Sequence, residues 1–243
     1  MVLLIFFGSV ARAEEDLDAG GNVKLETQED YTKSYKQRRS THGMLLGFSK
    51  EDFYPIDYQS LFGDAFVEDI VGSDSINLIN FDIGYKYNVS VGSASFLFSY
   101  ATGARSDGIS GRRLSLTKQG LSANVALDGI LEEPWAVPYL QVGVHQFNIS
   151  ESTDTASESA TTSMSFNYRY GLLFQLDWLE HFMDPNARGD RLRSSGLENT
   201  YIDVYYTDYM PSGDAQDAKV LGAEGDPNLL SSGEMGIGLK LEF

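Results

Sequence analysis

Hydrophobic and polar residues alternate along much of the chain. In the last residues, Ser232–Phe243, apolar side chains occupy every second position from Met235 onward, and glycine, lysine or glutamate fills the positions between. Successive side chains of a strand point to opposite faces, so this period predicts a strand with one apolar and one polar face. The same period recurs in seven earlier stretches: 44–49, 79–88, 93–100, 121–128, 139–149, 164–177 and 202–207. The pattern therefore predicts eight strands.

The composition of the two faces indicates how these strands are arranged. The apolar faces are rich in Tyr and Phe, and the opposite faces carry Asp, Lys, Arg and Asn. A transmembrane barrel turns its polar face inward and its apolar face to lipid. We predict an all-β fold, an eight-stranded antiparallel up-and-down transmembrane β-barrel over residues 41–243. A soluble β-sandwich or lipocalin-like barrel is the alternative, because its strands also alternate.

The N-terminal part has a different pattern. An apolar run at residues 2–10, followed by Ala-Arg-Ala at 11–13, is typical of a secretory signal peptide, although a basic n-region is missing and the true start is expected upstream. A buried N-terminal strand is the alternative. Residues 14–40 are polar and of mixed charge, which predicts a flexible periplasmic leader. Beyond residue 10, no stretch approaches the roughly 20 apolar residues of a spanning helix.

The predicted connections fall into two sets if both barrel termini lie in the periplasm. Outer loops are predicted at 50–77, 103–113, 150–162 and 208–231, and periplasmic turns at 88–92, 128–136 and 178–198. The third turn is long for a periplasmic one, and its first half could form amphipathic helical turns at the membrane interface. Trp135 and Trp178 fall at the periplasmic rim, where they predict an aromatic girdle. A shift of the apolar face after His145 predicts a β-bulge there.

The polar faces predict what lies inside the barrel. An eight-stranded barrel is just wide enough for side chains to fill, and buried charges must pair or stay hydrated. Asp203 and Lys240 are expected at similar depth on neighbouring strands, and we predict that they pair. The predicted lumen polar network is Asn80, Asp82, Lys86, Asn124, Gln141, Asn167, Arg169, Asp203 and Lys240. This favours a plugged lumen, with a narrow path for a small solute as the alternative.

Charge and candidate chemistry narrow the function further. The chain has 18 Lys plus Arg against 35 Asp plus Glu, and it lacks cysteine. Nucleic acid is therefore excluded as a partner, and so is thiol chemistry. With only three histidines and no Ser-His signature, we predict no enzyme, no cofactor and a structural role for His145. The outer loops, with Glu51 counted among them, are acidic. They predict a solvated surface, with divalent cations, bound there or bridging to lipopolysaccharide, as the alternative and no dedicated metal site.

Several stretches resemble known families. The last strand resembles the closing strand of bacterial outer-membrane barrels, whose apolar positions and terminal aromatic form an assembly signal, here Ile237, Leu239, Leu241 and Phe243. Further stretches are similar to a small-barrel family of myxobacteria and related predatory Gram-negative bacteria: Tyr54–Gly63, Phe66–Gly72, Gly171–Trp178, Gly196–Tyr201 and Gly238–Phe243.

The resemblance implies a fold and a location, but no settled activity. It implies an outer-membrane location in a Gram-negative bacterium, contact with lipid and lipopolysaccharide, and insertion by the barrel assembly machinery. The resulting expectation is a structural or surface-interaction barrel, and a narrow channel for small polar or apolar solutes is the alternative.

Overall fold

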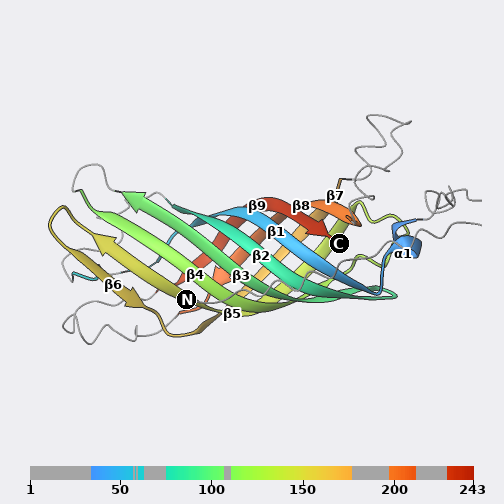
Figure 1. Ribbon diagram of the computed structural model, residues 1–243, viewed down its shortest axis with the longest axis horizontal. Coiled ribbons are helices and arrows are strands. Elements are labelled where there is room, and N and C mark those ends of the chain that lie inside the picture. The colour runs from blue at the N-terminus through green and yellow to red at the C-terminus, as the bar shows by residue number, and fades with distance from the viewer. Residues whose placement is uncertain are drawn as a thin grey trace, which may run out of the picture. The chain divides into compact units, whose positions relative to one another are not determined.

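The strands close into a barrel. The computed structural model describes residues 34–56, 58, 60–62, 75–106, 111–176, 197–211 and 229–243 (Figure 1). The elements are α1 (Tyr35–Arg38), β1 (His42–Phe53), β2 (Ile76–Val89), β3 (Gly92–Ser106), β4 (Arg113–Ala126), β5 (Ala136–Ser152), β6 (Ser157–Thr161), β7 (Ser165–Gln175), β8 (Asn199–Tyr209) and β9 (Ser231–Glu242). All pairings are antiparallel, and β1 pairs with both β2 and β9. With β6 as an addition, this confirms the predicted eight-stranded up-and-down barrel.

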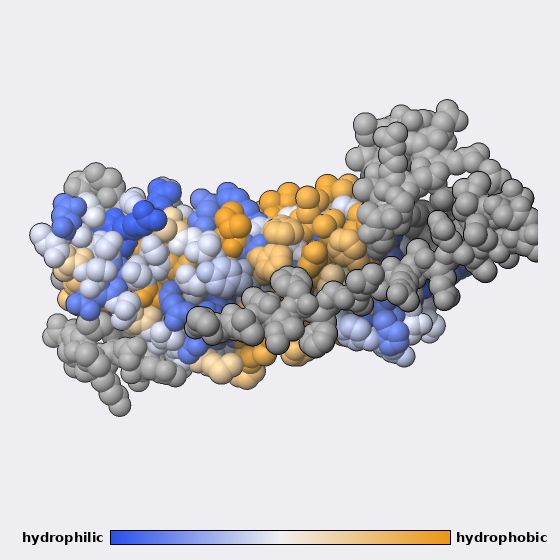
Figure 2. Space-filling view, in the orientation of Figure 1, coloured by the Kyte–Doolittle hydropathy of each residue, from blue (hydrophilic) through white to orange (hydrophobic). Residues whose placement is uncertain are grey.

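The outside of the barrel carries an apolar belt. Side chains alternate between the two faces along every barrel strand, and large apolar ones point outward, among them Phe48 at 52%, Phe96 at 58% and Phe166 at 69% exposure. Figure 2 shows them gathered over the middle of the barrel, with polar side chains toward the ends. Such a band would be unstable in water and is what a transmembrane barrel presents to lipid.

Among the described residues, α1 is the only helix. The described residues include no helix that is both long and apolar enough to cross a membrane.

The interior is filled at both ends by apolar clusters. We call the end with α1 and Phe243 the terminal end, and the opposite end the loop end. At the loop end a large cluster includes Phe53, Phe147 and Leu229, and near the terminal end a smaller one includes Tyr139 and Tyr201. Charged residues lie near and between these clusters, as the following sections describe.

Strand β5 corrects two predictions. The bulge expected near His145 is wrong, because β5 runs without a register shift along β4, with His145 opposite Gly120. Phe147 keeps its place on the inner face and joins the loop-end cluster, while Asn148 on the outer face is exposed. The shift of the apolar face therefore marks the limit of the belt. The predicted loop 150–162 is also wrong in part, since β5 and β6 form a hairpin there.

The predicted leader needs correction at its C-terminal end. Residues 34–40 contact the barrel instead of remaining free: Tyr35 is fully buried, and the Lys36 amide donates to the Glu132 carbonyl at 3.2 Å. These partners lie far away in sequence, so the polar composition could not indicate the contact. The predicted signal peptide, the leader up to residue 33, Trp178 and most of the turn after it lie outside the described residues.

Candidate functional site

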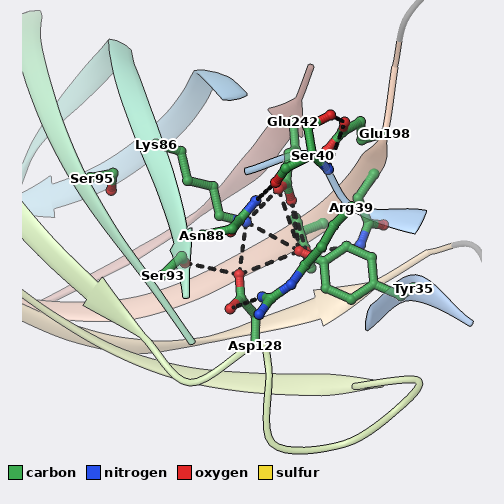
Figure 3. Close-up of polar contacts among 12 residues, drawn as sticks. Tyr35, Arg39, Ser40, Lys86, Asn88, Ser93, Ser95, Asp128, Glu198 and Glu242 are labelled. Atoms are coloured by element: carbon green, nitrogen blue, oxygen red, sulfur yellow. Dashed lines mark hydrogen bonds and ion pairs between the residues drawn. The ribbon is translucent and has the colours of Figure 1, made fainter. Parts of the chain in front are cut away.

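Polar side chains close the terminal end of the barrel. The Lys86 ammonium lies 2.7 Å from an Asp128 carboxylate oxygen and also contacts the Glu242 carboxylate (Figure 3). The Tyr35 hydroxyl, brought in by α1, donates to Glu242 at 3.1 Å, and it accepts a hydrogen bond from Lys86 at 3.1 Å. Arg39 pairs with Asp128 at 2.8 Å. We call these five residues the mouth cluster.

The chain before β1 is held over this cluster by local and distant bonds. Ser34 and Gln37 form a capping box at the start of α1. The Tyr35 amide donates to Glu133 at 2.7 Å, and the Asn88 side chain donates to the Ser40 carbonyl at 2.7 Å. Burial, followed by the neighbouring Glu242 carboxylate, raises the pKa of Tyr35 well above its ordinary value. The phenol therefore stays protonated and can donate to Glu242.

A second cluster lies deeper in the barrel around Arg169, which is buried. Its guanidinium lies 3.1 Å from Glu51 and 3.5 Å from Asp82, and its Nε donates to the Thr207 hydroxyl at 3.1 Å. The guanidinium carbon lies 4.0 Å from the centre of the Tyr205 ring. Two carboxylates, a hydroxyl and an aromatic face thus compensate one buried cation, which a charge inside a barrel requires.

Lys118 and Tyr209 complete this second cluster. Lys118 donates to the Tyr209 hydroxyl at 2.6 Å, and that hydroxyl donates to Glu51. We call Glu51, Asp82, Lys118, Arg169, Thr207 and Tyr209 the central cluster. The prediction that Glu51 belongs to an outer loop is wrong, because β1 continues to Phe53 and turns Glu51 inward, where it is fully buried.

The predicted pair of Asp203 and Lys240 is present. The Lys240 ammonium lies 3.3 Å from an Asp203 carboxylate oxygen and 4.6 Å from the centre of the Tyr139 ring. The Tyr139 hydroxyl donates to Asp203 at 2.8 Å. The Asp203 and Lys240 charges therefore compensate each other inside the barrel.

The structure divides the other predicted lumen residues among separate groups. Eight of the nine are buried inside the barrel, and Asn167 is half-buried. Lys86 belongs to the mouth cluster, and Asp82 and Arg169 belong to the central cluster. The sequence analysis does not identify several residues of these two clusters, nor the buried glutamate of the loop end described below: Tyr35, Arg39, Glu51, Lys118, Asp128, Glu242 and Glu151. Alternation could have identified Glu51 and Glu242, whereas nothing in the local sequence marks Tyr35.

The rim and closing-strand residues lie at the surface or at the seam of the barrel. Trp135 is 63% exposed at the terminal end, and Ile237 and Leu239 are exposed on the belt. The Phe243 amide donates to Met44 at 2.9 Å, and its carbonyl accepts from Met44 at 2.7 Å. The last residue thus extends the ladder between β9 and β1 that closes the barrel.

The loop end is closed by the chain that follows β1. Glu151, fully buried on β5, accepts hydrogen bonds from the Tyr58 hydroxyl at 3.2 Å, Ser60 Oγ at 2.8 Å and the Leu61 amide at 2.9 Å. Arg112 lies 3.3 Å from the same carboxylate. Burial, together with Glu151, raises the pKa of Tyr58 well above its ordinary value, which keeps this phenol a donor.

Replacing Glu151 by alanine should release this loop. Three donors and a partly buried cation would lose their acceptor, and hydrogen bonds to charged groups contribute about 1.5–3 kcal/mol each. We expect amide hydrogen exchange at Leu61 to accelerate by roughly 100-fold, which corresponds to about 3 kcal/mol of local opening. Glu158→Ala is the matched control, because Glu158 lies opposite Glu151 on β6 and is half-buried. Equal exchange in both variants would contradict the assignment.

His145, the remaining candidate for chemistry, lies among aromatic side chains. His145 packs edge-on against Phe147 and Tyr209, with ring centres 5.2 and 5.0 Å away. Among the described residues, no group of three or more His, Asp or Glu side chains is placed to hold a metal ion. What these polar groups do together is neutralise one another inside the barrel and close its two ends.

Comparisons with known proteins add a likeness of fold. No family model and no curated protein matches the chain. Among solved structures, Neisserial surface protein A is 14% identical with a TM-score of 0.48, covering 84% of this chain and 98% of that one. Ail of Yersinia pestis is 14% identical with a TM-score of 0.46, covering 84% and 100%. The N-terminal barrel domain of Pseudomonas aeruginosa OprF is 14% identical with a TM-score of 0.41, covering 84% and 98%. The resemblance to a myxobacterial family stays a prediction.

Proposed function

We propose that this protein is an integral outer-membrane barrel of a Gram-negative bacterium, with a structural or surface-interaction role and a lumen filled by side chains. The closure of both ends carries this proposal. Tyr35 occupies the terminal mouth together with its ion pairs, and Tyr58 and Leu61 occupy the loop-end mouth. A solute would have to displace ordered chain at each end and also pass the buried central cluster.

The proposed orientation places the terminal end in the periplasm. The shortest connection, residues 90–91 between β2 and β3, lies at that end, and the long connections 54–75 and 210–230 join strands at the loop end. The connection 176–198 departs from this rule, since it is equally long and joins β7 to β8 at the terminal end. The belt would contact lipid, with lipopolysaccharide near the loop end. The barrel assembly machinery would recognise the closing strand through Ile237, Leu239, Leu241 and Phe243. The acidic outer surface could recruit divalent cations.

A narrow channel for small polar or apolar solutes is the second candidate, and the polar side chains along the interior favour it. Planar-bilayer recording separates the two. We expect no stepwise conductance from the native protein and none from Lys240→Met, because the lumen is packed. Discrete steps in the native protein, altered in size or ion selectivity by Lys240→Met, would overturn the closed barrel in favour of the channel.

A further inference from the structure

Among the described residues, strand β6 presents an unpaired backbone edge at the loop end. It lies in line with β7 along one edge of β5 (Figure 1). The Thr162 amide donates to the Phe147 carbonyl, and the Thr153 amide donates to the Ala156 carbonyl. Because backbone groups in an antiparallel pair alternate in direction, those of Ser157, Ser159 and Thr161 point away from β5. No strand of the described residues pairs with that edge.

A proline ends the described pairing of the neighbouring strand. Strand β8 runs beside β7, and the Met210 amide still bonds to the Phe166 carbonyl at 2.9 Å. The next residue is Pro211, which has no amide to donate and which interrupts a ladder. Ser165 Oγ donates to the carbonyls of both Met210 and Pro211, at 2.9 and 2.8 Å. The regular pairing of β8 therefore stops before it reaches the level of β6.

The edge lacks most of the usual protection against strand addition. It carries no lysine, no proline and no bulge, and its outward side chains are small hydroxyls at Ser157, Ser159 and Thr161. Two carboxylates lie beside this edge, Glu158, half-buried on β6, and Asp154 at the hairpin tip. The nearby arginines lie on the other side of β5, where Arg113 of β4 is opposite Ser152 and Arg112 pairs with Glu151. The chain as a whole has a net charge of −17. A basic segment would complement this charge.

We propose that the free edge of β6 binds an extended basic peptide segment of a partner protein, which adds to the sheet as a further strand. This deepens the surface-interaction role and rests on that proposed function. The partner residues opposite Ser157, Ser159 and Thr161 exchange backbone hydrogen bonds, and their side chains face water. The residues between them place Lys or Arg near Glu158.

A synthetic peptide tests this directly. The probe has about nine residues that alternate Thr and Lys, and its binding to the folded protein in detergent is followed by fluorescence anisotropy. We expect saturable binding that weakens by at least about tenfold when the Thr amides, which would face the edge, are N-methylated. N-methylation keeps the charge, so equal binding of both peptides would show simple attraction between opposite charges and overturn the proposal. Absence of saturable binding would also overturn it.

Two variants locate the binding. Ser159→Pro removes an amide that points away from β5, so it should weaken binding as strongly as N-methylation while the barrel keeps its heat-modifiable migration. Ser159→Ala keeps the amide and should bind normally. Because the chain lacks cysteine, a Ser159→Cys variant can form a disulfide only between two copies of the protein. Disulfide-linked dimers after oxidation would show that a second copy occupies the edge, and would overturn the proposal. Stepwise conductance in planar bilayers would contradict the closed barrel but would leave these peptide-binding results unchanged. Failure of the proposed function can therefore be distinguished from failure of the peptide-binding proposal.

Discussion

Replacing Arg169 by methionine should destabilise the barrel by about 3–5 kcal/mol, because the buried Glu51 and Asp82 carboxylates then share a single cation, Lys118. The remaining cation of the central cluster, Lys118, bonds to Glu51 only through Tyr209. Urea unfolding of the protein in lipid vesicles would measure the change as a shift of the transition midpoint.

Two control variants sharpen this prediction. Arg113→Met removes an exposed arginine of β4 and should change stability little. Combining Arg169→Met with Glu51→Gln should restore part of the lost stability, because the double variant removes one of the uncompensated charges. If Arg169→Met unfolds at the same urea concentration as Arg113→Met, the central cluster does not hold the barrel together.

Replacing Gly236 by valine should prevent the barrel from closing. A Cβ atom at this position would overlap the Tyr205 ring, which is itself buried and stacked beneath Arg169. Tyr205 cannot move away without breaking its contact with the central cluster, so we expect a loss of at least about 3 kcal/mol. The yield of folded barrel, measured as the heat-modifiable fraction on a gel, should fall at least about tenfold.

Leu239→Val on the same strand is the matched control. Its side chain lies on the apolar belt, where a slightly smaller residue meets lipid and not a packed neighbour. This variant should fold like the native protein. A normal folded yield for Gly236→Val would mean that Tyr205 does not occupy the space beside β9.

Alternation predicted the fold well, because lipid contact imposes it on the outer face of each strand. It underestimated strand length for the same reason. The predicted strand at 121–128 is β4, which begins at Arg113, because its outer face becomes polar where the strand leaves the belt. The same effect at the end of β1 explains why alternation places Glu51 in a loop. The pairing of Asp203 with Lys240 could be predicted from the sequence, because the number of residues between each of them and a strand end gives its depth in the barrel.

Contacts made from outside the barrel pattern could not be predicted. Tyr35 reaches the mouth cluster from a segment whose composition is that of a mobile leader, and its partner Glu242 lies at the other end of the chain. Tyr58 and Leu61 likewise fold back onto Glu151. Such contacts depend on the closed barrel, which brings distant segments together. The local alternation of apolar and polar residues does not indicate them.

The central claim is that this chain folds as a closed barrel in the outer membrane. The most direct test is electrophoresis in SDS of outer-membrane fractions, with and without boiling. The account predicts that the unboiled protein migrates at a different position and shifts to its unfolded position on heating, because the closed ladder resists SDS. Recovery in the soluble periplasmic fraction, with identical migration before and after heating, would contradict it.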